Sequence, residues 1–220
     1  EGYLLIDTPV KFAELIKRLA EVKALAVDTE TTSVDPMSAE LVGISLAWTE
    51  DDAVYIPVGH DGDVAQLDKE TVLSGLRSFL GTDKVKNWGQ NIKYDASVVK
   101  RAGLEQGSLD FDSMVASYLL NPTRHRHGLD ALALEYLGHT PITFKEVVGS
   151  GRNQVTIDKI EPEKVSAYAC EDAQLAYLLA RLLAPKLKDD DLEELFAKIE
   201  RPLIEVLVRI EMNGVHLDIE

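Results

Sequence analysis

The chain has only one cysteine, Cys170, among its 220 residues. A single thiol allows no intrachain disulfide, and this fits an intracellular setting. Long hydrophobic runs are missing as well, since no apolar stretch approaches the length of a membrane span. A disulfide-stabilised protein and a membrane-spanning protein are therefore both unexpected.

Positive charge is also scarce. Lys and Arg number 23 against 38 Asp and Glu, which gives a formal net charge of -15. This balance argues against broad, sequence-independent nucleic-acid binding over the whole surface, although a local basic groove is compatible with it. Hydrophobic residues make up 45% of the chain, enough for a globular core. The sequence starts at Glu1 rather than at a Met, and we expect it to be a fragment.

The pattern of hydrophobic residues predicts an α/β domain. The first part reads as a helix followed by three strands that form an antiparallel meander, with an acidic hairpin loop at 49–52. Short strands then alternate with helices, which indicates a mixed sheet, and 141–156 reads as mostly irregular. The predicted strands are 24–28, 41–48, 53–58, 84–88 and 109–111, and the predicted helices are 9–20, 68–80, 91–101, 112–120, 129–137, 162–183 and about 190–212.

One stretch carries the first indication of chemistry. Residues 24–37 read A-L-A-V-D-T-E-T-T-S-V-D-P-M, an apolar strand that ends in Asp28 and Glu30. Because residues i and i+2 of a strand point to the same face, the two carboxylates would lie side by side, with Thr29 turned the other way. Such carboxylates repel each other unless a cation such as Mg²⁺ lies between them. On this stretch alone, a strand end with two solvated acids is the simpler interpretation.

Two further segments place an acid four residues after a polar side chain. N-I-K-Y-D at 91–95 begins a predicted helix, and Y-A-C-E-D at 168–172 lies inside the long predicted helix. Residues four apart share one helix face. Asp172 lies near the apolar stripe of its helix, an unfavourable place for a carboxylate without a partner. The alternative for Tyr168 and Asp172 is a half-buried tyrosine beside a solvated acid.

The three motifs, D-x-E, N-x-x-x-D and Y-x-x-x-D, resemble in order and spacing the DEDD exonucleases that carry a tyrosine in the last motif. The match extends to V-D-T-E-T, G-Q-N-I-K-Y-D, F-D-S-M, R-H-G-L-D-A-L-A, I-T-F-K-E and Y-A-C-E-D-A. Together they are similar to the 3′–5′ proofreading exonuclease domain of bacterial DNA polymerase I, and the resemblance covers nearly the whole chain. It implies a ribonuclease H-like fold, a mixed five-stranded sheet flanked by helices, in which the middle strand of the meander runs antiparallel to the rest.

The C-terminal segment 201–215, R-P-L-I-E-V-L-V-R-I-E-M-N-G-V, resembles the beginning of the polymerase domain in the same family. We therefore expect residues 1–188 to form the exonuclease domain. Residues 189–220 would form a linker helix and the start of a polymerase domain that is otherwise absent from the sequence.

The resemblance also implies a catalytic site with two divalent metal ions, Mg²⁺ or Mn²⁺, with Zn²⁺ as an alternative at one position. Asp28 would bridge both ions, Glu30 and Asp172 would complete the first, and Asp95 would hold the second largely through water. Tyr168 would orient the attacking water, because a phenol with a pKa near 10 is a poor general base. The implied catalytic residues are Asp28, Glu30, Asp95, Tyr168 and Asp172, and the four acids are the implied metal ligands.

The implied partners are the 3′ end of single-stranded DNA and the polymerase domain of the same polypeptide, in a cytoplasmic, nucleoid-associated monomer that contacts no membrane. Val34 would wedge between the last bases, Phe144 would stack on a base, and Arg126 would meet a backbone phosphate, with Arg124 and Lys93 nearby. The residues expected to contact DNA are Val34, Gln90, Asn91, Tyr94, Arg126 and Phe144.

The resemblance implies a proofreading activity in DNA replication and repair, in which the terminal phosphodiester of single-stranded or frayed DNA is hydrolysed from the 3′ end. Two other functions compete with it. A ribonuclease D-like enzyme would trim RNA with the same acids, although the similarity of the C-terminal segment to a polymerase argues against it. A non-catalytic module would only support a polymerase, and the presence of all five catalytic residues argues against that.

Overall fold

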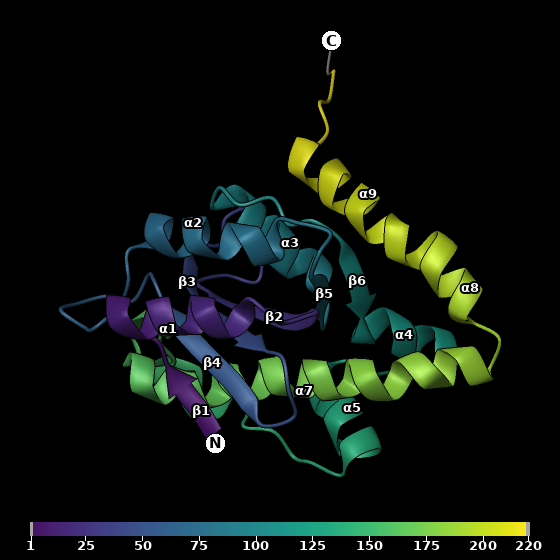
Figure 1. Cartoon of the computed structure of the whole chain (residues 1–220), viewed down its shortest axis with the longest axis horizontal. Coiled ribbons are helices and arrows are strands. Elements are labelled where there is room, and N and C mark those ends of the chain that lie inside the picture. Colours follow the sequence, from purple (N-terminus) through teal and green to yellow (C-terminus); the bar gives the residue numbers. More distant parts are fainter. Residues whose placement is uncertain (1, 219–220) are drawn as a thin grey trace.

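The computed structural model describes residues 2–218, and a six-stranded mixed sheet forms its centre (Figure 1). The strand order is β1-β4-β3-β2-β5-β6. The middle strand of the meander, β3, is antiparallel to both of its neighbours, as predicted, and all other pairs are parallel. The strands are β1 (Gly2–Leu5), β2 (Ala24–Thr31), β3 (Leu41–Ala47), β4 (Asp52–Pro57), β5 (Lys86–Gly89) and β6 (Leu109–Asp112).

The sheet has one strand more than the five predicted. β1 adds to the outer edge of β4 in parallel, with Gly2 opposite Asp52 and Leu5 opposite Tyr55. Its side chains are mostly exposed, and Leu4 is 44% exposed, so no alternation of apolar and polar residues marks this strand in the sequence. The α/β, ribonuclease H-like class is confirmed, and only the strand count changes.

Helices cover both faces of the sheet (Figure 1). α1, α2 and α3 lie on one face, and the long α7 crosses the other. Within residues 2–218, no helix combines the length and the apolar character that a bilayer span requires. The helices are α1 (Pro9–Leu19), α2 (Lys69–Leu80), α3 (Ile92–Arg101), α4 (Ser113–Leu120), α5 (Leu129–Leu132), α6 (Phe144–Val148), α7 (Pro162–Asp189), α8 (Glu193–Leu195) and α9 (Arg201–Asn213), with short 3₁₀ or π turns at Ala133–Leu137, Gly151–Asn153, Ile157–Lys159 and Phe196–Glu200.

The helices differ from the prediction in three places. The predicted helix at about 190–212 begins at Glu193 and consists of α8, the π turn Phe196–Glu200 and α9. α7 continues to Asp189, through Pro185, rather than ending near residue 183. α6 forms inside the stretch predicted to be irregular, because Thr143 and Glu146 make a capping box in which each side chain accepts from the backbone of the other. This helix is five residues long, too short to show a helical period in the sequence.

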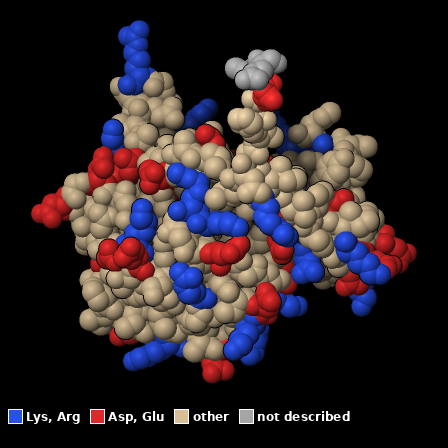
Figure 2. All heavy atoms as spheres, turned by 90° about the horizontal axis from the view of Figure 1, so that it is seen from above, with Lys and Arg blue, Asp and Glu red and all other residues tan. Residues whose placement is uncertain are grey.

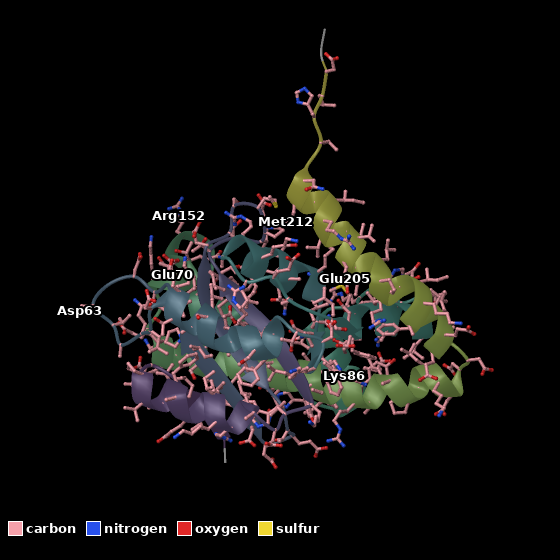
Figure 3. The ribbon with its side chains drawn as sticks, turned by 45° about the horizontal axis from the view of Figure 1, so that its top comes forward. Asp63, Glu70, Lys86, Arg152, Glu205 and Met212 are labelled. Carbon is pink, nitrogen blue, oxygen red and sulfur yellow. The ribbon has the colours of Figure 1, made fainter. Side chains whose placement is uncertain are left out.

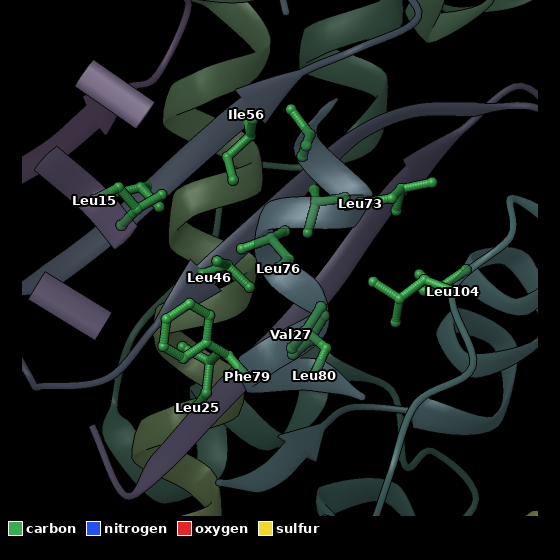
Figure 4. Packing of buried hydrophobic residues seen from close by; sticks show 14 of the residues in the cluster. Leu15, Leu25, Val27, Leu46, Ile56, Leu73, Leu76, Phe79, Leu80 and Leu104 are labelled. Atoms are coloured by element: carbon green, nitrogen blue, oxygen red, sulfur yellow. The ribbon is translucent and has the colours of Figure 1, made fainter. Parts of the chain in front are cut away.

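The alternation of side chains along β2 decides which residues meet which helices. Leu25 and Val27 are fully buried in the cluster that α1, α2 and α3 form over the sheet (Figure 4), whereas Ala26 belongs to the cluster under α7. Because the alternation continues, Thr29 faces α3, and Asp28 and Glu30 face α7. The prediction that the two acids share one face is confirmed by these contacts.

The last helix, α9, packs against α3 and β6. Ile204 and Val208 are buried against Ile92 and Ala96 of α3, and Met212 packs on the edge of the same cluster (Figure 3). Lys93 and Glu211 add an ion pair at 2.5 Å between the two helices. α9 therefore shares a small core with the helix that carries Asp95.

Close packing of β3 against the Tyr55 ring yields a stability prediction. A Cβ atom added at Gly43 would lie 2.2 Å from the hydroxyl oxygen of the buried Tyr55, which is hydrogen-bonded to His60 at 2.7 Å. We expect Gly43→Ala to lower the free energy of unfolding by roughly 1–3 kcal/mol in urea denaturation, the usual cost of overpacking. Gly128→Ala is the control, because its Cβ would meet nothing within 4 Å. Equal urea midpoints for the two variants would contradict this packing.

Candidate active site

Three carboxylates converge where β2 faces α7. One oxygen each of Asp28, Glu30 and Asp172 lies within 4.8 Å of the other two. Asp28 and Glu30 come from alternate positions of β2, and Asp172 comes from the side of α7 that packs on the sheet. Glu30 is only 6% exposed and Asp172 only 9%. The packing of α7 on the sheet therefore brings three acids together, with Glu30 and Asp172 nearly buried and Asp28 partly exposed.

Burial and mutual repulsion raise the pKa of all three acids. Burial is the main cause at Asp28 and Glu30, whose pKa values lie well above the ordinary range, and the charges of neighbouring carboxylates add to it. Burial, followed by the charge of Asp28, raises the pKa of Asp172 to about 8. The protein alone thus compensates the negative charge of this cluster poorly.

The donor set fits a divalent cation. Glu30 Oε1 is buried and has no hydrogen-bond partner anywhere in residues 2–218. Hard cations such as Mg²⁺ take carboxylate oxygens as ligands, and a positive charge between the acids would relieve their repulsion. Asp28, Glu30 and Asp172 therefore form a candidate metal site.

Asp95 approaches the end of β2 from the opposite face of the sheet. Its buried carboxylate accepts a hydrogen bond from Thr29 Oγ1 at 2.6 Å, and it is not a member of the three-carboxylate cluster. Burial raises its pKa to about 7, and its charge contributes to the raised pKa of Asp28. The four acids thus surround one strand end, with Asp95 near Asp28 but outside the three-carboxylate cluster.

Tyr168 lies one helical turn before Asp172 on α7. Its ring packs against Phe144, with the ring centroids 6.3 Å apart and the planes inclined by 60°. Burial, followed by the charge of Asp172, raises the pKa of its hydroxyl above the ordinary value. The side chain therefore stays a neutral phenol, which can orient a water molecule through a hydrogen bond but cannot serve as a general base at neutral pH.

A groove of about 460 Å³ runs past Glu30 and Tyr168. Four of the six residues expected to contact DNA line it, namely Val34, Asn91, Tyr94 and Phe144, and Val34 is 95% exposed. Residues 154–156 line the same groove and were not predicted. The nearby Gly149-Ser150-Gly151 indicates a loop in the sequence but does not indicate where that loop folds.

The other two residues expected to contact DNA, Gln90 and Arg126, do not line the groove. The Gln90 side-chain amide donates to the His127 carbonyl at 2.7 Å and accepts from Ser113, so it ties the start of α3 to the Arg-rich loop. Arg126 is exposed at a separate hollow beside Arg124. A DNA contact through either residue stays a prediction.

The cations expected to help Arg126 are engaged in internal contacts. Arg124 pairs with Glu135 and lies over the Tyr136 ring at 5.6 Å, and Lys93 pairs with Glu211. Arg126 forms no ion pair within residues 2–218. Figure 2 shows basic and acidic side chains intermixed over the face that it presents.

One more acid beside the site was not predicted. Glu171 is buried next to Asp172, accepts a hydrogen bond from the Ile142 amide at 2.6 Å, and is bonded to His139 Nε2 at 2.8 Å. These bonds fix residues 139–142 on α7 just before Phe144. His139 therefore has a structural role.

Comparison with known proteins gives consistent matches. A family model described as 3′–5′ exonuclease matches residues 3–188. The chain is 40% identical over 212 residues to DNA polymerase I of Pseudomonas aeruginosa and 38% identical over 213 residues to DNA polymerase I of Rhizobium leguminosarum. These alignments cover 94% and 88% of this chain but 23% and 21% of the relatives. The chain thus spans less than a quarter of the length of these curated relatives.

Solved structures share the fold at low sequence identity. The polymerase Pol1 from M. smegmatis, in complex with DNA primer-template and dNTP, superposes with a TM-score of 0.76 and 18% identity, covering 99% of this chain and 33% of that one. Brucella melitensis NrnC with bound Mg²⁺ superposes with a TM-score of 0.72 and 20% identity, covering 99% and 96%. At these identities the likeness supports the fold alone.

The raised pKa values predict that the protein without divalent cations loses stability as pH rises. Asp95 and Asp172 have folded-state pKa values of about 7 and about 8, against 3.8 for an ordinary aspartate. The folded state therefore keeps protons that the unfolded chain releases, a contribution that is complete below the unfolded value and lost as pH rises through the folded values. We expect the Tm in EDTA to fall between about pH 5.5 and 8.5, and to fall less in Asp172→Asn.

The control for this measurement is Asp51→Asn, which changes an exposed aspartate in the β3–β4 loop. Its Tm profile should follow that of the parent. Parallel profiles for the parent and Asp172→Asn would contradict the raised pKa of Asp172.

Proposed function

Since the chain belongs to the 3′–5′ exonuclease domain family of DNA polymerase I, we propose that it removes nucleotides from the 3′ end of single-stranded or frayed DNA by hydrolysing the terminal phosphodiester. In this proposal it proofreads during DNA replication and repair as part of a family A DNA polymerase. The observation that carries the proposal is the cluster of Asp28, Glu30 and Asp172 beside a groove lined by exposed apolar side chains.

The four acids would hold two divalent cations, Mg²⁺ or Mn²⁺. Asp28, Glu30 and Asp172 would hold one, and Asp95 together with Asp28 the other. Such cations, when bound, activate the attacking water and stabilise the leaving 3′ oxygen. The protein contributes a site in which burial and neighbouring carboxylates disfavour the charged form of each acid, as the raised pKa values show. A bound cation would favour the charged form again.

The remaining groups orient the reactants. Tyr168 donates or accepts a hydrogen bond as a neutral phenol and so directs the attacking water, a contact worth roughly 10²–10⁴ in rate at most. Tyr94 is held by a hydrogen bond from its hydroxyl to the Ser33 carbonyl at 2.5 Å, so it presents a fixed surface to the groove. Val34 would wedge between the terminal bases, and Phe144 would stack on one of them.

We assign residues 1–188 to the exonuclease domain and 189–220 to a linker that leads into the polymerase domain, the partner in the same polypeptide. The end of the family match at residue 188 and the interruption of the helix at residues 190–192 support this boundary. Glu1, Ile219 and Glu220, at the ends of these ranges, lie outside the described residues. The monomeric state and the cytoplasmic, nucleoid-associated location belong to the same proposal.

The test is a degradation assay on matched DNA and RNA oligonucleotides of one sequence, with Mg²⁺ or with EDTA. We expect Mg²⁺-dependent shortening of the DNA from its 3′ end, and a loss of at least about 10³-fold in Asp28→Asn, because the substitution removes charge from the metal site. Asp51→Asn should retain the parent rate. Faster degradation of RNA would favour the ribonuclease D-like alternative, and degradation of neither substrate would favour the non-catalytic module.

The groove and the free Arg126 predict how DNA binding depends on salt. With Ca²⁺ in place of Mg²⁺ to slow cleavage, we expect a shallow dependence of log affinity on log salt. Arg126→Ala should reduce the slope by about 0.7, one phosphate contact on a single strand. Phe144→Ala should weaken binding by roughly 1–3 kcal/mol without changing the slope, because stacking involves no ion release.

The control is Arg124→Ala, because Arg124 is engaged with Glu135. Its slope should stay closer to that of the parent than the slope of Arg126→Ala. A steep slope in the parent would contradict this proposal and indicate a basic groove that grips many phosphates.

A further inference from the structure

Asp112, the last residue of β6, accepts hydrogen bonds from two different helices. It is 2% exposed. Its Oδ1 atom accepts from the amides of Met114, at 2.8 Å, and Val115, at 3.1 Å, in the first turn of α4. Its Oδ2 atom accepts from the amide of Ile92, at 2.9 Å, and Oδ1 also accepts from that of Asn91, at 3.3 Å. An ordinary N-cap residue serves only the helix that follows it.

α3 depends on this carboxylate because it has no cap of its own. Asn91 precedes the helix in a left-handed conformation, φ 59° and ψ 42°, and its side chain makes no capping bond. The first amides of a helix lack partners within the helix. Asp112 can supply an acceptor for these amides because it is paired with Gly89 in the parallel β5–β6 register. This pairing places the ends of the two strands side by side.

The first turn of α3 carries two residues of the proposed site. Asp95 lies three residues after Ile92 and reaches Thr29 at 2.6 Å, and Tyr94 lines the groove. Ile92 itself is fully buried. Since one turn of helix is held together by its own hydrogen bonds, a shift at Ile92 moves Tyr94 and Asp95 with it.

We propose that Asp112 is a positioning residue for the exonuclease site, which holds α3 at the axial position and rotation that bring Asp95 to the end of β2. Asp112 is neither a metal ligand nor a substrate contact, because both of its oxygens face backbone amides. The inference rests on the proposed function, since that function gives Asp95 its role.

Asp112→Ser separates positioning from ordinary capping. Serine is a favoured N-cap, so its hydroxyl can still cap α4, but its one short oxygen cannot also accept from Ile92. Asp68→Ser is the matched control. Asp68 caps α2 alone, through the amide and the hydroxyl of Thr71, both at 2.8 Å. Both substitutions make the same chemical change at an N-cap, and only one of them removes a link to α3.

The experiment measures Mn²⁺ binding by calorimetry without DNA, and the kcat and KM of the nuclease reaction, on the full chain. We expect Asp112→Ser to weaken the Mn²⁺ binding event that Asp95→Asn also weakens and to reduce kcat, each by roughly 10–100-fold, the usual effect of removing a group that orients a ligand. Asp68→Ser should match the parent in both. In an Asp95→Asn background, Asp112→Ser should cause no further loss of Mn²⁺ affinity, because the residue through which it acts is already changed.

Three results would overturn the inference. The first is an Asp112→Ser protein that binds Mn²⁺ and cleaves DNA like the parent. The second is an equal loss of Mn²⁺ affinity from Asp112→Ser in the parent and in the Asp95→Asn background, which would mean a general effect on the fold. The third is a parent chain that neither binds Mn²⁺ nor cleaves DNA, which overturns the proposed function as well.

Should Asp112→Ser fail to fold, Asp112→Asn takes its place with the same three outcomes. The asparagine keeps one acceptor oxygen and turns an amide donor toward one of the two helix starts, so it weakens one link while preserving the size of the side chain.

Discussion

Repulsion between buried carboxylates is the constraint on which the rest of this domain depends. Asp28, Glu30 and Asp172 would move apart in a flexible chain, yet here they stay within 4.8 Å of one another. What holds them is apolar packing: Ala169, Cys170 and Ala173 of α7 are fully buried under the sheet, and their small side chains let the helix approach closely. The hydrophobic core therefore offsets an unfavourable electrostatic arrangement, which is common at functional sites.

The residues that follow simple periodicity could be predicted from the sequence, and those that depend on tertiary contacts could not. A period of two placed Asp28 and Glu30 on one face, and a spacing of four placed Tyr168 and Asp172 on another. β1 was not predicted because it is short and exposed, and α6 was not predicted because it is only five residues long. The hydrogen bonds of Gln90 and the ion pair of Arg124 could not be predicted from local sequence patterns, since each partner lies more than ten residues away in the chain.

A net charge of -15 would oppose binding of the proposed polyanionic substrate, and the face shown in Figure 2 mixes basic with acidic side chains. The groove beside the acids presents Val34, Phe144 and Val155, whose exposed apolar surface can interact with bases whatever the salt concentration. Under the proposed function, specificity for a strand end would come from shape and from the local charge of the candidate metal site. In the proposed function, long-range attraction would therefore contribute little to binding.

The contact between α9 and α3 has a mechanical consequence. The two helices share the buried Ile204 and Val208 and the ion pair between Lys93 and Glu211, and Lys93 directly precedes Tyr94. α3 is also anchored at its start by Asp112, so the helix is held both from β6 and from α9. The placement of Tyr94 and Asp95 therefore depends on contacts from β6, through Asp112, and from α9, through its packing on α3.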